Sequence, residues 1–270
     1  MRIRKVTSET WLVIPALLLS GLTDAGKVEL KPPTTQAFER YIQSTEAKLD
    51  QRVHTPAFLW VDGDASRRSA VQRGEAICEP VSAKGDIEVP DGLVHDWVGG
   101  MFVRGATLEK VIGLFENYDN AKNIYKPEVI DSKTLARDGN SFKVYMRLLK
   151  KQVVTVVLNT THDVRYVSVD STHWYSKSYS SRIAEVENAG KASERELPPG
   201  QDHGFLWRLN SYWRFEERDG GVYVECQAVS LTRDVPTGLG WLINPIIRSL
   251  PRQSLENTLR SAQKAAMKMK

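Results

Sequence analysis

Apolar and polar residues alternate most regularly between residues 205 and 216. The odd positions hold Phe205, Trp207, Leu209, Trp213 and Phe215, and the even positions hold Arg208, Asn210, Tyr212, Arg214 and Glu216. A period of two residues is typical of a strand with one buried face. The pattern therefore predicts a strand whose odd face lies against a core and whose even face meets water.

The residues that follow predict a hairpin. Asp219-Gly220 favours a two-residue turn, because both positions of such a turn need a left-handed backbone. This turn would place Phe215 opposite Val224, Trp213 opposite Cys226, and Arg214 opposite Glu225. Apolar residues would then face apolar residues, and opposite charges would face each other. A slip of one residue would lose that agreement.

Helix and strand signals fill the rest of the chain. After an extended Lys31-Pro32-Pro33, apolar positions at helical spacing predict an N-terminal helix with Phe38, Ile42, Thr45 and Leu49 on one face. Thr107 is expected to cap a helix whose apolar stripe reaches Tyr118. The expected strands before residue 190 span 75–83, 92–103, 130–135, 142–149, 153–159, 164–169 and 174–186. Turns are expected at Asp138-Gly139 and at residues 161–163.

The chain ends on an amphipathic helix. We expect Pro251 in its first turn, where a missing N–H costs nothing. Its buried stripe would hold Leu255, Leu259, Ala262, Ala266 and Met269. The apolar stretch 241–247 before it, interrupted by Pro245, is a candidate gate or a plain kinked core helix.

Composition and the first residues define the domains and the compartment. The 270 residues include 41% hydrophobic ones, enough for a substantial core, and a formal charge of +4 is too weak to indicate nucleic acid as a partner. Residues 1–25 have the charged, apolar and small-residue order of a signal peptide. We therefore expect a signal peptide at 1–25, a helical extension at 26–69, a main domain at 70–270, and a periplasmic or secreted protein. An uncleaved leader that anchors the chain is the alternative.

Three stretches resemble a known superfamily. They are Gly105-Ala106-Thr107-Leu108 leading into Glu116-Asn117-Tyr118-Asp119, Trp207-Arg208-Leu209 with Trp213-Arg214-Phe215, and Leu231-Thr232-Arg233-Asp234-Val235-Pro236. With the order of elements, they resemble a bacterial exported branch of the START-like (SRPBCC) helix-grip superfamily, which includes birch-pollen allergen relatives, polyketide cyclases and coenzyme Q-binding proteins. The resemblance implies an α+β fold in which a curved antiparallel sheet wraps around a long C-terminal helix.

The resemblance also implies a function, which is to bind a lipid-like or quinone-like molecule between the sheet and the C-terminal helix. The residues expected to line that site are Tyr118, Trp174, Arg182, Trp207, Trp213, Cys226 and Trp241. Opposite Trp213 and Ser211, the small residues Cys226 and Ala228 leave room for a ligand. Partners would be an apolar or amphipathic small molecule and, transiently, a membrane surface. An envelope module that binds another protein is a further alternative.

Arg182 can be placed in two ways. If the even residues of 174–186 point inward, Arg182 lines the interior and binds an anionic head group, since an unpaired interior charge is costly. If the odd residues point inward, Tyr175, Tyr179 and Ile183 pack and Arg182 is a solvated surface charge, which the pattern slightly favours.

Catalytic signatures are weak. The His-Asp neighbours at 95–96, 162–163 and 202–203 would face opposite sides of a strand, and their spacing does not indicate a metal site. No cofactor is indicated. A cyclase, dehydratase or hydrolase using His173 or His203 with Asp202 remains the enzymatic alternative. Cys78 and Cys226 could pair in an exported protein, although Cys226 at an inward position favours a free thiol.

Overall fold

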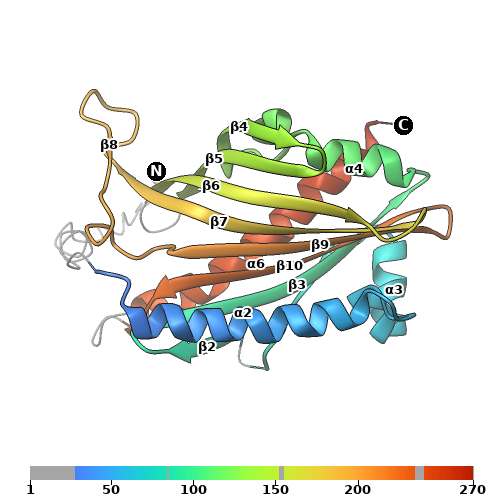
Figure 1. The fold of residues 1–270 in the computed structure, drawn as a ribbon, viewed down its shortest axis with the longest axis horizontal. Helices are drawn as coiled ribbons and strands as arrows, with labels where there is room; N and C mark the ends of the chain where they lie inside the picture. The colour runs from blue at the N-terminus through green and yellow to red at the C-terminus, as the bar shows by residue number, and fades with distance from the viewer. Residues whose placement is uncertain (1–27, 84, 152–154, 235–239, 270) are drawn as a thin grey trace, which may run out of the picture.

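The fold is a single large antiparallel sheet with helices on both faces (Figure 1). The computed structural model describes residues 28–83, 85–151, 155–234 and 240–269, and for residues 240–248 it describes the backbone only. The expected signal peptide lies outside these ranges. Within them, no helix is long and apolar enough to cross a bilayer.

The sheet has ten strands. Its main path runs β1-β3-β10-β9-β7-β6-β5-β4, with β2 paired to β3 and β8 paired to β7. The strands are β1 (Ile77–Pro80), β2 (Asp86–Val89), β3 (Gly92–Arg104), β4 (Val129–Asp138), β5 (Ser141–Lys151), β6 (Thr155–Ser168), β7 (His173–Glu187), β8 (Arg195–Glu196), β9 (Arg208–Arg218) and β10 (Gly221–Arg233).

The hairpin between β9 and β10 has the predicted register. Phe215 lies opposite Val224, Trp213 opposite Cys226, and Arg214 opposite Glu225. The turn residues Asp219 and Gly220 have φ angles of 54° and 73°, as a two-residue hairpin of this type requires.

Two layers of helix enclose the sheet. On one side lie α4 (Leu108–Glu116), the short η2 (Tyr118–Asn120) and α5 (Ala121–Ile124), and the long α6 (Gly240–Met267). On the other side lie α2 (Pro32–Arg52), η1 (Trp60–Gly63) and α3 (Ala65–Gln72). Figure 1 shows α2 in front of the sheet and α6 behind it. The predicted α+β helix-grip architecture is confirmed, with the N-terminal extension forming the second layer.

We call the side of the sheet that faces α6 the inner face. Its residues form one core cluster in which Met101, Val103, Phe215 and Val224 of the central strands pack with α4 and α6. The residues that α4 and α6 contribute are Leu108, Val111, Ile112, Leu114, Phe115, Leu255, Leu259, Ala262 and Ala266. These are the apolar stripes that the helical spacing predicts, except that Met269 is 43% exposed.

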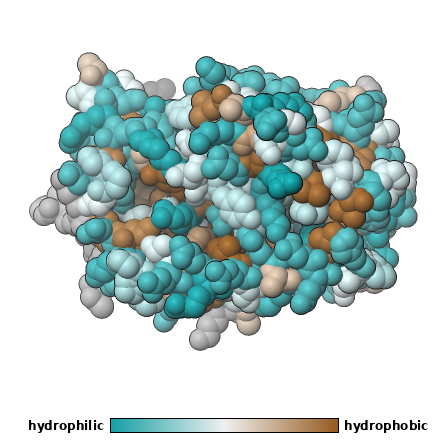
Figure 2. Space-filling view, in the orientation of Figure 1, coloured by the Kyte–Doolittle hydropathy of each residue, from teal (hydrophilic) through white to brown (hydrophobic). Residues whose placement is uncertain are grey.

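The opposite side, the outer face, is also buried, which corrects the expectation of a wetted face. Phe38 and Leu49 of α2 pack on Val94, Val229 and Leu231 of the sheet. Phe58, Leu59 and Val61 pack with Phe102 and Tyr223. The even-numbered β9 residues Asn210, Tyr212, Arg214 and Glu216 are all below 8% exposed. The alternation of β9 therefore separates two covered faces rather than a dry face from a wet one. On the side of the molecule that Figure 2 shows, the surface is predominantly hydrophilic with separate apolar spots.

Charged and polar side chains join the extension to the outer face. Arg52 at the end of α2 donates through both Nη atoms to Glu225, at 3.0 and 2.8 Å. The Arg214 guanidinium donates to the carbonyl oxygens of Leu49 and Phe58. Its neighbour across the ladder is Glu225. Each buried charge thus has an opposite charge or a carbonyl beside it, as burial requires.

Hydroxyl-carboxylate bonds continue this contact along α2. Tyr179 and Tyr212 both donate to Glu46 Oε1, at 2.7 and 2.9 Å. Tyr41 donates to Asp96 Oδ2 at 2.7 Å, and Gln227 Nε2 lies 2.9 Å from both oxygens of Asp96. Burial raises the pKa of the Asp96 carboxyl to about 6, against the bonds from Tyr41 and Gln227, which lower it.

Three local predictions are wrong. Residues 161–163 lie within β6, because their neighbours on β5 and β7 continue the ladder through them. Pro32 and Pro33 form the first turn of α2 rather than an extended linker, a position that suits a residue without N–H. Pro251 lies inside α6, which is one helix from Gly240, so tertiary packing overrides the helix-breaking tendency of proline here.

Two adjacent glycines on β3 allow the helices on both faces to pack close to the sheet. A Cβ atom on Gly99 would lie 2.7 Å from Leu259 Cδ1 of α6 and 2.6 Å from the Ile77 carbonyl oxygen. A Cβ atom on Gly100, on the opposite face, would lie 3.2 Å from Val61 Cγ1 of η1. Gly99 therefore sets the distance between α6 and the inner face.

We predict that Gly99→Val destabilises the protein by about 1 to 3 kcal/mol or more, because neither the backbone oxygen nor the core leucine can move freely. The free energy of unfolding from urea titration tests this. Gly113→Ala, on α4 with open space around its Cβ position, is the matched control and should be neutral or slightly stabilising. An unchanged stability of the Gly99 variant would contradict the packing described.

We predict a pH-dependent gain in stability for Asp96→Asn. The folded-state pKa is about 6 and the reference value is 3.8, so the folded protein holds this proton more tightly than the unfolded chain. The stability that protonation supplies is complete below about pH 4 and is lost as the pH rises through 6. The variant should gain roughly 3 kcal/mol at most over wild type between pH 4 and pH 7. Urea titrations at four pH values measure it. Asp91→Asn, at an exposed residue, is the control, and a gain that does not vary with pH would refute the prediction.

Candidate functional site

The centre of the inner face is less buried than the outer face behind it. Leu209, Ser211 and Trp213 of β9 are half-buried, whereas the even residues between them are buried. Trp174 of β7 and Ala228 of β10 are also half-buried on this side. We call the surface formed by Trp174, Ser176, Ser178, Leu209, Ser211, Trp213 and Ala228 the inner patch. It offers apolar surface that solvent still reaches inside the fold.

Small side chains are neighbours in the inner patch. Ser178 lies opposite Ser211, and Ser211 lies opposite Ala228. In the next row Ser176 lies opposite Trp213, which lies opposite Cys226. Short side chains on three adjacent strands leave space above the sheet at this point. Large side chains on all three strands would fill that space.

Aromatic rings pack together along one side of the inner patch. Phe115 of α4 contacts Trp213 and Phe215 edge to face, with ring centroids 4.8 and 5.0 Å apart. Such geometry adds to the burial energy and fixes the ring planes. Trp213 is therefore held from one side while its other surface remains reachable.

The hydroxyl of Ser176 is the polar atom of the patch that stands out. Ser176 is 1% exposed, and its Oγ has no hydrogen-bond partner among the described residues. A buried hydroxyl without a partner costs about 1 to 3 kcal/mol. Such atoms are uncommon in native interiors and call for a ligand or a water molecule as partner.

Of the neighbouring polar groups on the inner face, two pairs are hydrogen-bonded, whereas Trp97 Nε1, opposite Ala228, is buried without a partner among the described residues. Tyr118 and Tyr166 share a hydrogen bond of 2.9 Å between their hydroxyls, and burial raises the pKa of both phenols. His162 Nε2 lies 3.0 Å from Thr160 Oγ1. Burial lowers the pKa of His162 to about 4, so its ring is neutral near pH 7.

Four of the predicted lining residues lie on the inner side. Tyr118 and Cys226 belong to the inner core cluster, and Trp174 and Trp213 pack against it. The sequence pointed to the small side chain of Ala228 as room for a ligand, but Ser176 and Leu209 were not among the residues expected to line the site. Only their half-burial or missing hydrogen bond marks them, and neither can be deduced without the position of α6.

Trp207 lies elsewhere. It precedes β9 and packs in the outer cluster with Phe38 of α2, and its Nε1 donates to Asp202 at 3.2 Å. The alternation of β9 does not extend back to it, because the strand begins at Arg208. The side chain of Trp241, and with it the proposed gate at 241–247, lies outside the described side chains.

Arg182 lies on the outer side, as in the second orientation considered, but Tyr175 and Tyr179 do not point inward as that orientation expected, because both pack in the outer clusters. The ladder between β6 and β7 shifts register between Thr161 and His162, whose partners are Arg182 and Ser180, so Ser181 is an extra residue. Even residues before this bulge point inward and odd residues after it do so. Arg182 pairs with Glu196 and is largely exposed. A ligand on the inner patch therefore does not meet its charge.

The histidines expected to act with neighbouring aspartates have other partners. His203 Nδ1 lies 2.7 Å from Glu185, and His173 Nδ1 lies 2.9 Å from Asp170. His95, fully buried, lies 2.6 Å from Asp86. None of these pairs belongs to the inner patch, and the described residues hold no cluster of His, Cys, Asp and Glu suited to a metal ion.

Cys78 and Cys226 are free thiols. Both are partners of Gly99, one from each side, so a whole strand separates them. Two strand spacings amount to roughly 10 Å, beyond the reach of a disulfide bond.

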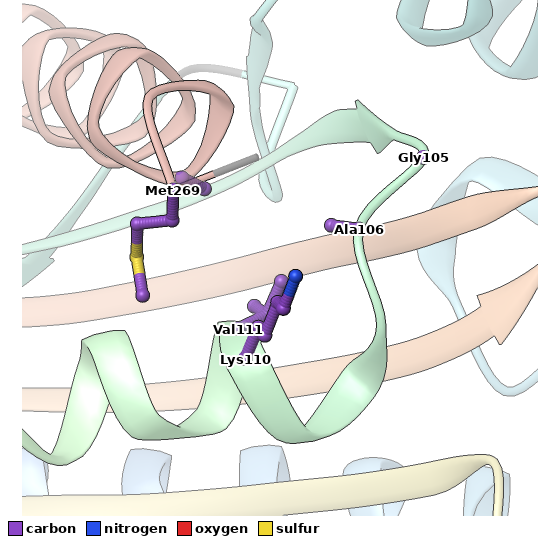
Figure 3. Close-up of a pocket in the computed structure, with 6 residues that line it drawn as sticks. Gly105, Ala106, Lys110, Val111 and Met269 are labelled. Carbon is purple, nitrogen blue, oxygen red and sulfur yellow. The ribbon is translucent and has the colours of Figure 1, made fainter.

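A separate hollow lies where α4 meets the end of α6 (Figure 3). Gly105, Ala106, Lys110, Val111, Ala266 and Met269 line it, and its volume is about 10 Å³. That is room for about one water molecule, so the hollow does not suit an organic ligand.

Comparisons with known proteins find likeness in fold. No protein-family model and no curated protein matches the sequence. Among solved structures, TTHA0849 from Thermus thermophilus matches with a TM-score of 0.47 and 14% identity over 64% of this chain and 97% of that chain. A STAR-related lipid transfer protein from Xanthomonas axonopodis gives 0.41 and 16% over 69% and 98%. Human STARD10 gives 0.42 and 10% over 74% and 80%.

Proposed function

We propose that this protein binds a hydrophobic or amphipathic small molecule on the inner patch, between the sheet and α6. The observation that carries the proposal is the half-burial of Leu209, Trp213 and Ala228 on a face that a helix covers. Contact between water and apolar surface inside a fold is unfavourable. A ligand that covers it gains free energy.

The patch suits binding better than catalysis. Burial of apolar ligand surface contributes about 25 cal/mol per Å², so a ligand that buries some 300 Å² gains several kcal/mol before the costs of association. The described patch residues include no carboxylate and no histidine, the groups that most often carry acid-base chemistry. Reversible binding is therefore the function that we assign.

We predict that filling the patch abolishes binding. Ala228→Phe and Ser211→Phe place rings on the floor between β7 and β10, where the ligand would lie. The affinity for the uncharged dye N-phenyl-1-naphthylamine, measured by its fluorescence, should fall at least about tenfold in each variant. Native mass spectrometry of the purified wild type should also show a retained apolar molecule.

Leu135→Phe is the control, because Leu135 is 50% exposed and lies on β4, away from the patch. It should bind the dye as wild type does, and circular dichroism should show all variants folded. Undiminished binding by folded Ala228→Phe would refute the patch as the site.

The compartment in which the protein acts is part of the same proposal. We infer that residues 1–25 direct export and are removed, on the order of charged, apolar and small residues in the sequence. The N-terminal extension would then begin the mature chain.

We expect N-terminal sequencing of the protein recovered from its native cells to begin after Ala25, in the periplasmic or secreted fraction. Replacement of Arg2 and Arg4 by Glu should retain the chain in the cytoplasm, since the charged start is required for export. An intact N-terminus in the cytoplasmic fraction of wild-type cells would contradict export.

A further inference from the structure

Four exposed cations gather at the end of the molecule where β3, α4 and α6 meet. They are Arg104 at the end of β3, Lys110 of α4, and Lys264 and Lys268 at the C-terminal end of α6. None of the four has an ion pair with another described residue, whereas Arg260, one turn earlier on α6, is paired with Glu256. Their charge is therefore available to a partner outside the chain.

The four cations belong to one continuous surface. Arg104 is followed directly by Gly105 and Ala106, which line the hollow between α4 and α6. Lys110 and Met269 line the same hollow, and Figure 3 shows their side chains from the two helices beside it. The end of β3, the start of α4 and the end of α6 therefore present their side chains together.

Exposed methionines lie among these cations. Met267 is 51% exposed and Met269 is 43% exposed, so both leave apolar surface in water. Lys264, Met267 and Lys268 are three and four residues apart, a spacing that makes them neighbours on a helix surface. We call the surface formed by Arg104, Lys110, Lys264, Met267, Lys268 and Met269 the basic end. It combines positive charge with flexible apolar side chains.

The helix dipole explains only part of this charge. Lys264 and Lys268 lie near the carbonyl end of α6, where cations are favourable. Lys110, in contrast, lies in the first turn of α4, which begins at Leu108, and the dipole disfavours a cation there. The charge of Lys110 thus gains nothing from its own helix and from no ion pair with a described residue.

The shape of the basic end favours a lipid surface over a protein partner. Its hollow has a volume of about 10 Å³, which holds about one water molecule and is too small for a side chain from a partner. A lipid surface needs no pocket, because anionic head groups attract the cations and the boundary of the acyl chains accepts the methionines.

We propose that the basic end docks on an anionic lipid surface, with Met267 and Met269 entering the head-group layer. Each cation close to such a surface strengthens binding about fivefold, so four of them give a reversible but measurable attachment. This inference goes beyond the proposed function and does not depend on it.

Co-sedimentation with vesicles tests the attachment. The protein is used without residues 1–25, so that their apolar run does not itself bind lipid. Vesicles of phosphatidylcholine and phosphatidylglycerol in equal parts should bind it at least about tenfold more tightly than vesicles of phosphatidylcholine alone. High salt should weaken the binding, because it screens exposed charges. Equal binding to both kinds of vesicle, or binding to neither, overturns the proposal.

Lys264→Glu combined with Lys268→Glu tests the surface. This variant should bind the mixed vesicles at least about tenfold more weakly, since two attractive charges become repulsive. Arg40→Glu combined with Lys48→Glu is the matched control, because both residues are exposed on α2, on the other side of the sheet, and the net charge changes equally. An equal loss in both variants would show an effect of net charge alone and would overturn the assigned surface.

Met267→Ser combined with Met269→Ser tests the apolar contact. Binding to the mixed vesicles should fall about fivefold, as expected for the loss of a modest buried apolar area. Ile130→Ser combined with Leu135→Ser removes two other exposed apolar side chains, both on β4, and should change nothing. Undiminished binding by the methionine variant overturns the entry of these side chains. All variants should keep their circular dichroism and bind N-phenyl-1-naphthylamine, which separates this inference from the proposed function.

Discussion

The burial of charge on the outer face is the constraint on which the rest of the structure depends. Arg214 and Glu225 are neighbours on β9 and β10, and each is 3% exposed or less. They are tolerable inside the protein only because Arg52 and the carbonyl of Leu49 meet them from α2. The extension is therefore part of the fold, and it keeps the charges of Arg214 and Glu225 on the outer side, away from the inner patch.

That separation leaves the inner face free for a different chemistry. The apolar core at one end, built on Met101, Phe115 and Leu259, fixes α6 through the glycine at position 99. Toward Leu209 the side chains shorten and the burial falls. A rigid end and a more open end on one face provide both a stable fold and a binding surface, as ligand sites on rigid scaffolds require.

The sequence predicted the pairing of neighbouring strands well, but it did not predict which faces of the sheet the helices cover. The β9–β10 register, the stripe of α6 and the inward position of Trp213 all follow from periodicity and turn chemistry, because these depend on near neighbours. The burial of Arg214 and Tyr212 does not follow, because polar residues on a strand normally indicate water and the covering helix lies far away in the sequence. The patch around Ser176 could not be recognised for the same reason, since accessibility depends on the helix above it.

The extra residue at Ser181 has a consequence for how such a protein can change. In a strand with a period of two, one added residue exchanges the two sides of everything beyond it, unless that residue is absorbed in a bulge. Because Ser181 is absorbed as a bulge, its deletion would keep Thr161 opposite Arg182 and His162 opposite Ser180, and would leave Arg182 on the outer side and Ile183 on the inner side. The bulge therefore marks a position where this strand can hold one residue more or one residue fewer without exchanging the side chains that line its interior.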